Sequence, residues 1–181
     1  GVLLTLGVDM RAAVDALGAA PPVRGRLEVV SRSPSQPLVL VDYAHTPDAL
    51  IRVLDTLRPL TRGRLLCVFG CGGERDRGKR PLMGRAVAER ADIAILTSDN
   101  PRSEDPRDIA ADVLPGLADL PSLSAEQLSD GVRGQWVELD RARAIEAAIG
   151  AACPDDVVVL AGKGHEDYQV IGNERRAFDD V

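Results

Sequence analysis

The chain has 181 residues, of which 45% are hydrophobic, and this is enough for one ordinary domain with its own core and a small appendage. Its 28 acidic residues outnumber the 22 lysines and arginines, and the net charge of -6 argues against a general binder of nucleic acids or membrane surfaces. The three cysteines show no disulfide-framework pattern, and no apolar run is long enough to span a membrane, so we expect a soluble cytoplasmic protein.

The amino-terminal residues predict a separate segment. Apolar residues recur there at helical spacing and Gly18 follows as a stop, so we expect one amphipathic helix over residues 1–20. Two prolines then interrupt the pattern, and we place a domain boundary between residues 1–22 and residues 23–181. The chain opens on an apolar run without a Met, which indicates a piece of something longer.

Short apolar runs alternate with helical patterns over the rest of the chain. Such alternation predicts an α/β fold: a Rossmann-like, mostly parallel sheet with helices on both faces and right-handed crossovers, followed by a C-terminal β-hairpin around Gly172-Asn173. Residues 115–135 have a loop-like composition. The expected strands cover residues 25–30, 38–41, 65–69, 93–96, 136–139 and 157–160, and the expected helices cover residues 50–57, 81–90, 106–114 and 140–152, the last with Ile145, Ala148 and Ile149 facing inward.

Polar residues follow the apolar strands. Because the carboxyl ends of parallel strands open on one edge of the sheet, we expect four loops to converge there. The third loop contains Asp99-Asn100-Pro101-Arg102, in which Pro restricts the shape of a turn carrying an acid, an amide and a guanidinium group. His45 and His165 also lie at strand ends, which favours ligand contact over a place in the core. The four loops are residues 42–48 (DYAHTPD), 70–76 (GCGGERD), 98–102 (SDNPR) and 161–166 (AGKGHE).

This edge carries charges of both signs. Guanidinium groups suit carboxylates or phosphates, and carboxylates suit ammonium groups. A mixed edge therefore fits a zwitterion such as an amino acid better than a plain anion. The cations are Arg75, Arg77, Lys79, Arg80, Arg102 and Lys163, and the acids are Asp42, Glu74, Asp99 and Glu166.

An alternative hypothesis is a stand-alone, P-loop-like nucleotide-binding module built on Gly73–Lys79. These residues satisfy the GxxxxGK part of a phosphate-binding loop. However, Arg80 stands where such a loop needs the hydroxyl of Ser or Thr to hold Mg²⁺, and Pro81 follows where another backbone N–H would point at phosphate.

A zinc site is a weaker alternative. Cys67, Cys71, Cys153 and His165 could be combined into a ligand set, but the first two have C-x₃-C spacing and Cys67 lies within a strand. Both features favour core thiols, and we expect no metal ligands.

Five motifs resemble the Mur ligases. The resemblance runs from about residue 1 to the end, and motifs of this length in this order are highly specific. It implies that residues 23–181 are the family's C-terminal, amino-acid-binding domain and that residues 1–22 are the last helix of its central ATPase domain with a linker. The motifs are GRLE (25–28), VDYAHTPDAL (41–50), FGCGGERDRGKRPLM (69–83), DNPR (99–102) and AGKGHEDYQ (161–169).

The resemblance implies an ATP-dependent ligase of peptidoglycan precursor synthesis. The family transfers the γ-phosphate of ATP to the carboxylate of UDP-N-acetylmuramoyl-L-alanyl-D-glutamate, and the amine of a third amino acid attacks the resulting acyl phosphate. The DNPR motif implies that this amino acid is meso-diaminopimelate. By resemblance, the amino acid would be bound by Arg75, Asp99, Asn100, Pro101, Arg102, Gly162 and Glu166, and the nucleotide by Arg26, Asp42 and His45.

The family's phosphate-binding loop, its Mg²⁺-binding carboxylated lysine, its UDP-binding domain and its last helix have no counterpart in these residues. We therefore expect ATP and Mg²⁺ to be bound mainly by domains outside this chain, and we expect the chain alone to be inactive. Neither nucleic acid nor a membrane is expected as a partner.

Overall fold

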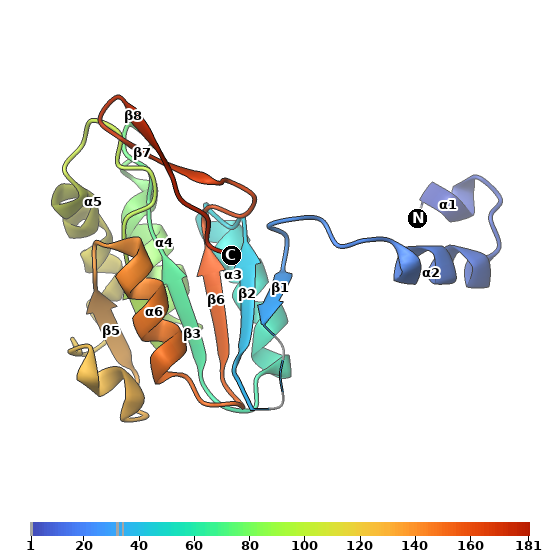
Figure 1. Cartoon of the computed structure of the whole chain (residues 1–181), viewed down its shortest axis with the longest axis horizontal. Coiled ribbons are helices and arrows are strands. Elements are labelled where there is room, and N and C mark those ends of the chain that lie inside the picture. The colour runs from blue at the N-terminus through green and yellow to red at the C-terminus, as the bar shows by residue number, and fades with distance from the viewer. Residues whose placement is uncertain (1, 32, 34) are drawn as a thin grey trace.

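The computed structural model describes residues 2–31, 33 and 35–181, and a six-stranded sheet forms its centre (Figure 1). The strands lie in the order β1-β2-β6-β3-β4-β5. Their bounds are β1 (Glu28–Ser31), β2 (Leu38–Asp42), β3 (Leu65–Phe69), β4 (Ile93–Leu96), β5 (Gly134–Val137) and β6 (Val157–Ala161). The α-helices are α1 (Val2–Thr5), α2 (Met10–Ala19), α3 (Pro47–Leu57), α4 (Lys79–Ala88), α5 (Pro106–Val113) and α6 (Arg141–Ala151).

The expectation of a mostly parallel sheet is confirmed. Strands β2, β6, β3, β4 and β5 all run parallel, and only β1 is antiparallel to its neighbour β2. The carboxyl ends of the five parallel strands therefore open on one edge, as crossover connections through helices require.

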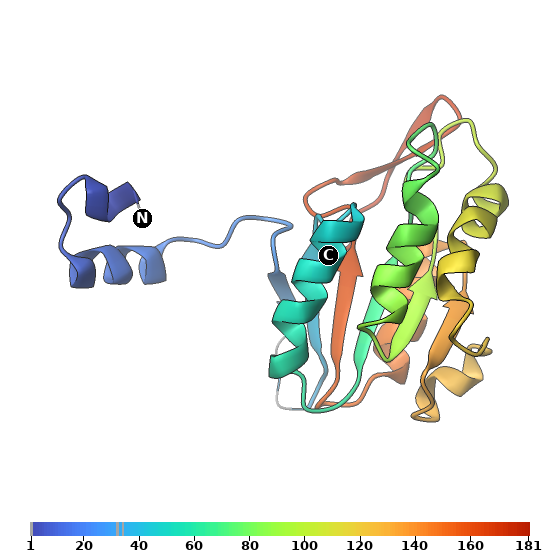
Figure 2. The same cartoon turned by 180° about the vertical axis from the view of Figure 1, so that it is seen from behind.

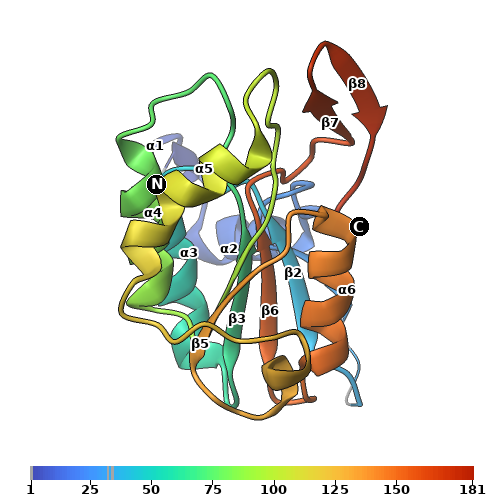
Figure 3. The same cartoon turned by 90° about the vertical axis from the view of Figure 1, so that its left-hand side faces the viewer.

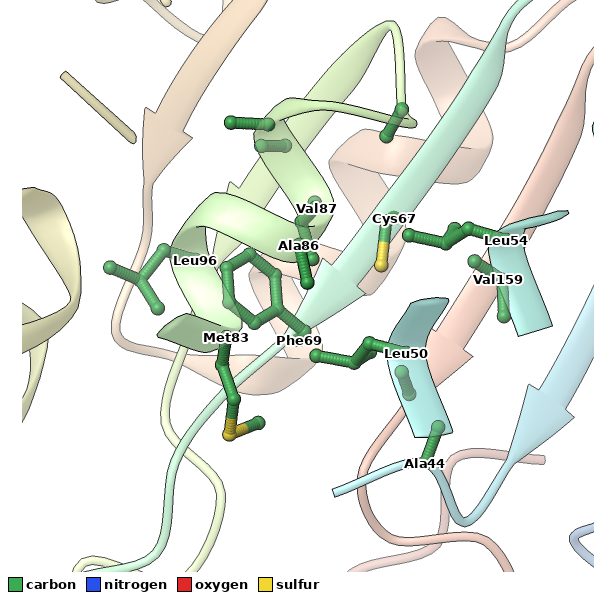
Figure 4. Close-up of a cluster of buried hydrophobic side chains, with 14 of the residues drawn as sticks. Ala44, Leu50, Leu54, Cys67, Phe69, Met83, Ala86, Val87, Leu96 and Val159 are labelled. Atoms are coloured by element: carbon green, nitrogen blue, oxygen red, sulfur yellow. The ribbon is translucent and has the colours of Figure 1, made fainter. Parts of the chain in front are cut away.

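Helices cover both faces of the sheet. Helices α3, α4 and α5 lie on one face and α6 lies on the other (Figure 2; Figure 3). Side chains alternate along β3, so that Cys67 and Phe69 pack toward α3 and α4 while Leu66 and Val68 pack toward α6. Figure 4 shows Phe69 between Leu50 of α3 and Met83 of α4. Burying a side chain such as Phe69 contributes about 1.5–3 kcal/mol, so this core holds the sheet and its helices together.

The predicted first helix is wrong in one respect, because the segment forms two helices. Gly7 interrupts it with a φ of 80°, a conformation that glycine adopts at little cost, and the Asp9 side chain then caps α2 by accepting from the amides of Arg11 and Ala12. Over residues 2–20, only Ala13 is buried. Helices α1 and α2 lie beyond β1, to the side of the sheet (Figures 1 and 2).

Three other expectations differ from the structure. The first strand begins at Glu28 because residue 25 is in a turn, where the Gly25 amide donates to the Glu28 carboxylate. Helix α6 buries Ala144 and Ala148, whereas Ile149 is 38% exposed. The loop-like stretch 115–135 contains short 3₁₀ turns at Leu114–Leu117 (η2) and Glu126–Ser129 (η3), and β5 already begins at Gly134.

The C-terminal hairpin is confirmed. Strands β7 (Tyr168–Ile171) and β8 (Glu174–Ala177) pair antiparallel around Gly172, whose φ is 59°. Figure 3 shows this hairpin above the carboxyl edge of the sheet. In the part of the chain that the structure describes, no helix combines the length and the apolar character that crossing a membrane requires.

Candidate functional site

Four loops meet at the carboxyl edge and enclose a cavity of about 360 Å³. Six of the seven residues predicted to bind an amino acid line this cavity, and so does His45. Pro101 does not line it. The lining residues are Tyr43, His45, Thr46, Gly72, Arg75, Asp76, Lys79, Asp99, Asn100, Arg102, Gly162 and Glu166.

The segment from residue 98 to residue 103 separates this cavity from a second one of about 830 Å³. Asp99, Asn100 and Arg102 line the smaller cavity, whereas Ser98, Pro101 and Ser103 line the larger one. Pro101 therefore shapes the segment but does not face the side on which the other predicted residues gather.

The C-terminal hairpin holds this segment in place. The Arg102 amide donates to the Val170 carbonyl at 3.0 Å, and the Gly172 amide donates to the Arg102 carbonyl at 2.7 Å. These two bonds hold Arg102 at a φ of 52°, a left-handed conformation that is strained for a residue with a side chain. The Val170 amide donates to Asn100 Oδ1 at 2.9 Å, which fixes the amide side chain as well.

Gly73 allows the second loop to approach the third. A Cβ atom on Gly73 would lie 1.9 Å from the Pro101 carbonyl oxygen. The Gly73 amide donates to the Asn100 carbonyl at 2.9 Å, and Arg102 Nη1 donates to the Gly73 carbonyl at 2.7 Å. The Arg102 guanidinium is therefore held at the edge of the cavity by backbone carbonyls.

The acids of the cavity gather around Lys163. Asp99 is 8% exposed, and its Oδ1 lies 3.6 Å from Lys163 Nζ without accepting a hydrogen bond. Glu166 Oε2 accepts from Asn100 Nδ2 at 2.9 Å and lies 3.9 Å from the same Nζ. Burial raises the pKa of Asp99, although the Arg141 and Lys163 cations oppose this rise. A buried carboxylate oxygen without a donor is a position where a ligand ammonium group would be stabilised.

Of the three residues predicted for the nucleotide, His45 lines the same cavity, whereas Arg26 and Asp42 are not among its lining residues. The Arg26 guanidinium lies 4.7 Å from the centre of the Tyr43 ring, and that ring lies 4.5 Å from the His45 ring. Both Asp42 oxygens accept backbone amides at 2.8 Å, those of Leu27 and Ala44. Asp42 thus fixes the turn that carries Arg26 against the end of β2.

Sequence reasoning missed Tyr43 and Lys163. Tyr43 contacts Arg26, His45 and His165 and lines the cavity, yet it was treated only as part of a loop. Its signal was an aromatic residue directly after the last residue of a buried strand. The sequence predicts Lys163 only as one of the cations of the polar edge, whereas the structure buries it completely and leaves it out of the cavity lining.

The P-loop alternative finds no support in the geometry. Arg80, at the position of the required hydroxyl, is 1% exposed and donates to the carboxylates of Glu104 and Asp112 and to the Gly72 carbonyl. Lys79 Nζ lies 4.0 Å from Asp76 Oδ2. The amides of Gly78, Lys79 and Arg80 already donate to Asp76 Oδ1, the Asp76 carbonyl and the Arg77 carbonyl, so these three amides form no free cradle for phosphate.

The cysteines behave as core thiols where they are buried. Cys67 and Cys71 are both buried, and burial raises the pKa of each to about 12. Cys153 is exposed. Over residues 2–31, 33 and 35–181, no group of three or more His, Cys, Asp or Glu side chains is arranged to hold a metal ion.

Comparison with known proteins gives a consistent result. The family described as "Mur ligase, glutamate ligase domain" matches residues 25–164. The UDP-N-acetylmuramoyl-L-alanyl-D-glutamate--2,6-diaminopimelate ligase of Synechocystis sp. is 52% identical over 178 residues, which are 98% of this chain and 33% of that protein. The ligase of the same name from Trichormus variabilis is 50% identical over 181 residues, which are 99% of this chain and 34% of that protein.

Solved structures agree. A structure of a UDP-N-acetylmuramoyl-L-alanyl-D-glutamate--2,6-diaminopimelate ligase matches with a TM-score of 0.75 and 45% identity, over 99% of this chain and 34% of that one. Escherichia coli FolC with ADP matches at a TM-score of 0.58 and 21% identity, over 86% of this chain and 32% of that one, which shows a shared fold. The chain spans about a third of the length of the relatives it matches. It belongs to the Mur ligase family, of which it carries the C-terminal domain.

Proposed function

We propose that this chain is the amino-acid-binding part of an ATP-dependent ligase that adds meso-diaminopimelate to UDP-N-acetylmuramoyl-L-alanyl-D-glutamate. The relatives of this name support the reaction, since they are about half identical to the chain over nearly its whole length. In this proposal residues 23–181 form the C-terminal domain, and residues 1–22 are the last helix of the central ATPase domain and a linker.

One observation carries the proposal: a single cavity is lined by the guanidinium groups of Arg75 and Arg102 and by the carboxylates of Asp99 and Glu166, besides the exposed Lys79–Asp76 pair. Guanidinium groups bind carboxylates in a directional way, and buried carboxylates bind ammonium groups. The far end of diaminopimelate carries both a carboxylate and an ammonium group, whereas the far end of lysine carries only an ammonium group. The mixed lining therefore suits diaminopimelate.

Asn100, Gly162 and Pro101 have supporting roles in this proposal. Asn100 bonds Glu166 on one side and the hairpin amide of Val170 on the other, so it fixes the acid that faces the ligand. Gly162 has a φ of 120° and leaves the space in front of Asp99 open, because a Cβ there would meet only the Asp99 carboxylate, at 3.9 Å. Pro101 lines the larger cavity and restricts the shape of the segment in which its neighbours Asn100 and Arg102 both line the smaller one.

The nucleotide side of the proposal rests on Arg26, Asp42 and His45. The Tyr43 and His45 rings and the Arg26 guanidinium present flat surfaces suited to a base, and Asp42 holds them in place. ATP would supply the phosphoryl group that activates the carboxylate of the UDP-linked substrate. In this proposal Mg²⁺ would be held mainly by residues outside this chain. The proposal includes a cytoplasmic location, where ATP is available.

An exchange experiment tests the proposal. In the exchange ligase, this chain replaces the segment of the Synechocystis enzyme with which it aligns. We expect the exchange ligase to form UDP-linked tripeptide from meso-diaminopimelate with stoichiometric phosphate release, and we expect the 181-residue chain alone to release none. An exchange ligase that folds and uses another amino acid in preference would contradict the proposed substrate. Phosphate release from ATP by the chain alone, abolished in Lys79→Ala, would instead support the P-loop hypothesis.

A further inference from the structure

Lys163 is a completely buried lysine at the end of β6, in the first turn of the loop that also carries Gly162 and Glu166. Its Nζ donates to the Tyr168 carbonyl at 2.5 Å and to Asn100 Oδ1 at 3.4 Å. The same atom lies 3.6 Å from Asp99 Oδ1 and 3.9 Å from Glu166 Oε2. One ammonium group therefore contacts three polar side chains of the cavity and the first residue of the hairpin.

The charges around Lys163 do not cancel, and a negative charge is left over. In their charged forms, the Asp99 and Glu166 carboxylates and the Lys163 ammonium group sum to a single negative charge, which one bound ammonium group would neutralise. The neighbouring Arg141–Asp180 pair does not change this sum, because both side chains are fully buried and Arg141 donates to both Asp180 oxygens, at 2.7 and 2.5 Å. The cluster is therefore matched to a ligand with one ammonium group facing it.

Lys163 does not line the cavity, although its three polar partners do. It lies behind them and contacts them from the protein side. Burying an ammonium group is costly, and replacement of a buried ion pair by apolar residues is often neutral or stabilising for a fold. An account based on stability alone therefore gives no reason for a lysine here, whereas the arrangement of Asp99, Asn100 and Glu166 does.

We propose that Lys163 is a positioning residue of the amino-acid cavity: its ammonium group holds the Asp99 and Glu166 carboxylates side by side, with Asn100 between them, in the arrangement that accepts a ligand ammonium group. This inference rests on the proposed function. Without Lys163 the buried Asp99 carboxylate and the half-buried Glu166 carboxylate would repel each other, so one would take up a proton or the segment from residue 98 to residue 103 would move. Either change would weaken ligand binding although Lys163 does not touch the ligand.

Binding by the full 181-residue chain provides the first test. Titration with meso-diaminopimelate, followed by amide NMR shifts, gives Kd for the wild type, Lys163→Met and Arg64→Met. Arg64 is the matched control, because it also makes a largely buried pair, with Asp156, but at the opposite edge of the sheet. We expect Lys163→Met to bind about 10- to 100-fold more weakly, the usual effect of losing a group that orients binding residues, and Arg64→Met to bind as the wild type does.

A second measurement needs no ligand. The titration of the Asp99 carboxyl, read from its ¹³C shift, reports on the groups that face it: Arg141, Lys163, Glu166 and Asp180. We expect the pKa of Asp99 to rise in Lys163→Met and to stay unchanged in Arg64→Met. If Lys163→Met does not fold, Lys163→Gln replaces it, since Gln keeps a donor for the Tyr168 carbonyl but not the charge.

The outcomes separate the two proposals. If the wild type binds meso-diaminopimelate and Lys163→Met binds it equally well, the positioning role is wrong and the proposed function stands. If the wild type does not bind it, the proposed function of the cavity is wrong, and the Asp99 titration still decides whether Lys163 controls this carboxylate. An unchanged Asp99 titration in both Lys163 variants would overturn the inference.

Discussion

Arg80 donates two hydrogen bonds to the carboxylate of Glu104, from Nη1 to Oε2 and from Nη2 to Oε1, both at 2.9 Å. Arg80 is at the beginning of α4, and Glu104 follows the segment that carries Arg102. The Glu104 carboxylate also accepts the Glu74 amide. This pair thus ties the loop of Arg75 to the loop of Arg102, so the two guanidinium groups of the cavity have a common support.

Glu104 gives the chain an acid-dependent stability. Hydrogen bonds from Arg80 and from the Glu74 amide lower the pKa of Glu104 from 4.5 to about 2. A lowered pKa stabilises the fold above the unfolded value, and this contribution is lost as the pH falls from about 4.5 toward 2. We expect the free energy of unfolding of Glu104→Gln to fall less than that of the wild type when the pH is lowered from neutral to this range. Urea unfolding at each pH measures it. Glu146→Gln, on the exposed side of α6, is the control; if Glu104→Gln shows the full acid dependence of the wild type, the pair contributes nothing.

The Arg141–Asp180 pair anchors the end of the described chain. Both side chains are fully buried, and Arg141 also donates to the Ala161 carbonyl at the end of β6. Removing one partner leaves an uncompensated buried charge, so Arg141→Met should lower the free energy of unfolding by about 3–5 kcal/mol. Urea denaturation measures this. Arg143 lies two residues along the same helix, and its side chain is 75% exposed. Arg143→Met should therefore change the free energy of unfolding by less than about 0.5 kcal/mol. Equal effects of the two variants would contradict the anchoring role of Arg141.

The sequence predicts the sheet and its polar edge well, because both follow from local patterns. Four fully apolar runs of four or five residues, each followed by polar residues, are sufficient to predict parallel strands whose ends converge. It does not predict that Arg102 has a positive φ, because that conformation is imposed by the hairpin at Val170 and Gly172. The DNPR motif therefore predicts Pro101 on the same side as its neighbours, although Pro101 faces the other cavity.

Buried charges are the other part of the site that sequence reasoning could not place. Arg80 and Lys163 look like surface cations in a polar loop, and their partners lie elsewhere in the chain: Glu104 is 24 residues from Arg80, and Asn100 is 63 residues from Lys163. Only the fold brings these groups together. The break at Gly7 was missed for a simpler reason, since apolar spacing on both sides of it fits one helix.

The Gly73→Ala variant tests how closely the second and third loops must approach each other. A methyl group there would collide with the Pro101 carbonyl, at 1.9 Å, so Gly73→Ala should displace the segment that carries Arg102 and destabilise the fold by about 1–3 kcal/mol. We expect meso-diaminopimelate binding to be lost in NMR titrations. Gly150→Ala is the control: nothing lies within 4 Å of its Cβ, and alanine in α6 should stabilise the chain by about 0.5–1 kcal/mol. Unchanged binding by Gly73→Ala would show that the loops do not support each other.

The Asp42→Ala variant tests the proposed role of Asp42 in binding the nucleotide. Loss of its bonds to the Leu27 and Ala44 amides should free the turn that carries Arg26. In the exchange ligase, Asp42→Ala should raise KM for ATP by about tenfold or more, the effect of losing a charge-assisted hydrogen bond, and leave KM for diaminopimelate unchanged. Asp48→Ala, exposed in the first turn of α3, should change neither constant. A raised KM for diaminopimelate together with an unchanged KM for ATP would show that the assignment of Asp42 to the nucleotide is wrong.

Arg102 tests the central claim, that the cavity distinguishes diaminopimelate from lysine by the carboxylate at its far end. The Arg102 side chain is fixed by the Gly73 carbonyl and lines the cavity. With lysine bound, the Arg102 guanidinium would therefore face no ligand carboxylate. A site built to bond a polar group rejects an analogue that lacks it, here by several kcal/mol, on the order of a hundredfold or more in rate. Arg107→Ala, an equal change of charge on α5 beside the other cavity, is the control.

The decisive measurement is the ratio of kcat/KM for meso-diaminopimelate to kcat/KM for lysine, in the exchange ligase and in its Arg102→Ala variant. We predict that Arg102→Ala greatly reduces kcat/KM for diaminopimelate while that for lysine holds or rises, so that the ratio falls by about a hundredfold or more. If both values fall by the same factor and the ratio stays unchanged, Arg102 shapes the loop and does not recognise the substrate, and the claim is contradicted.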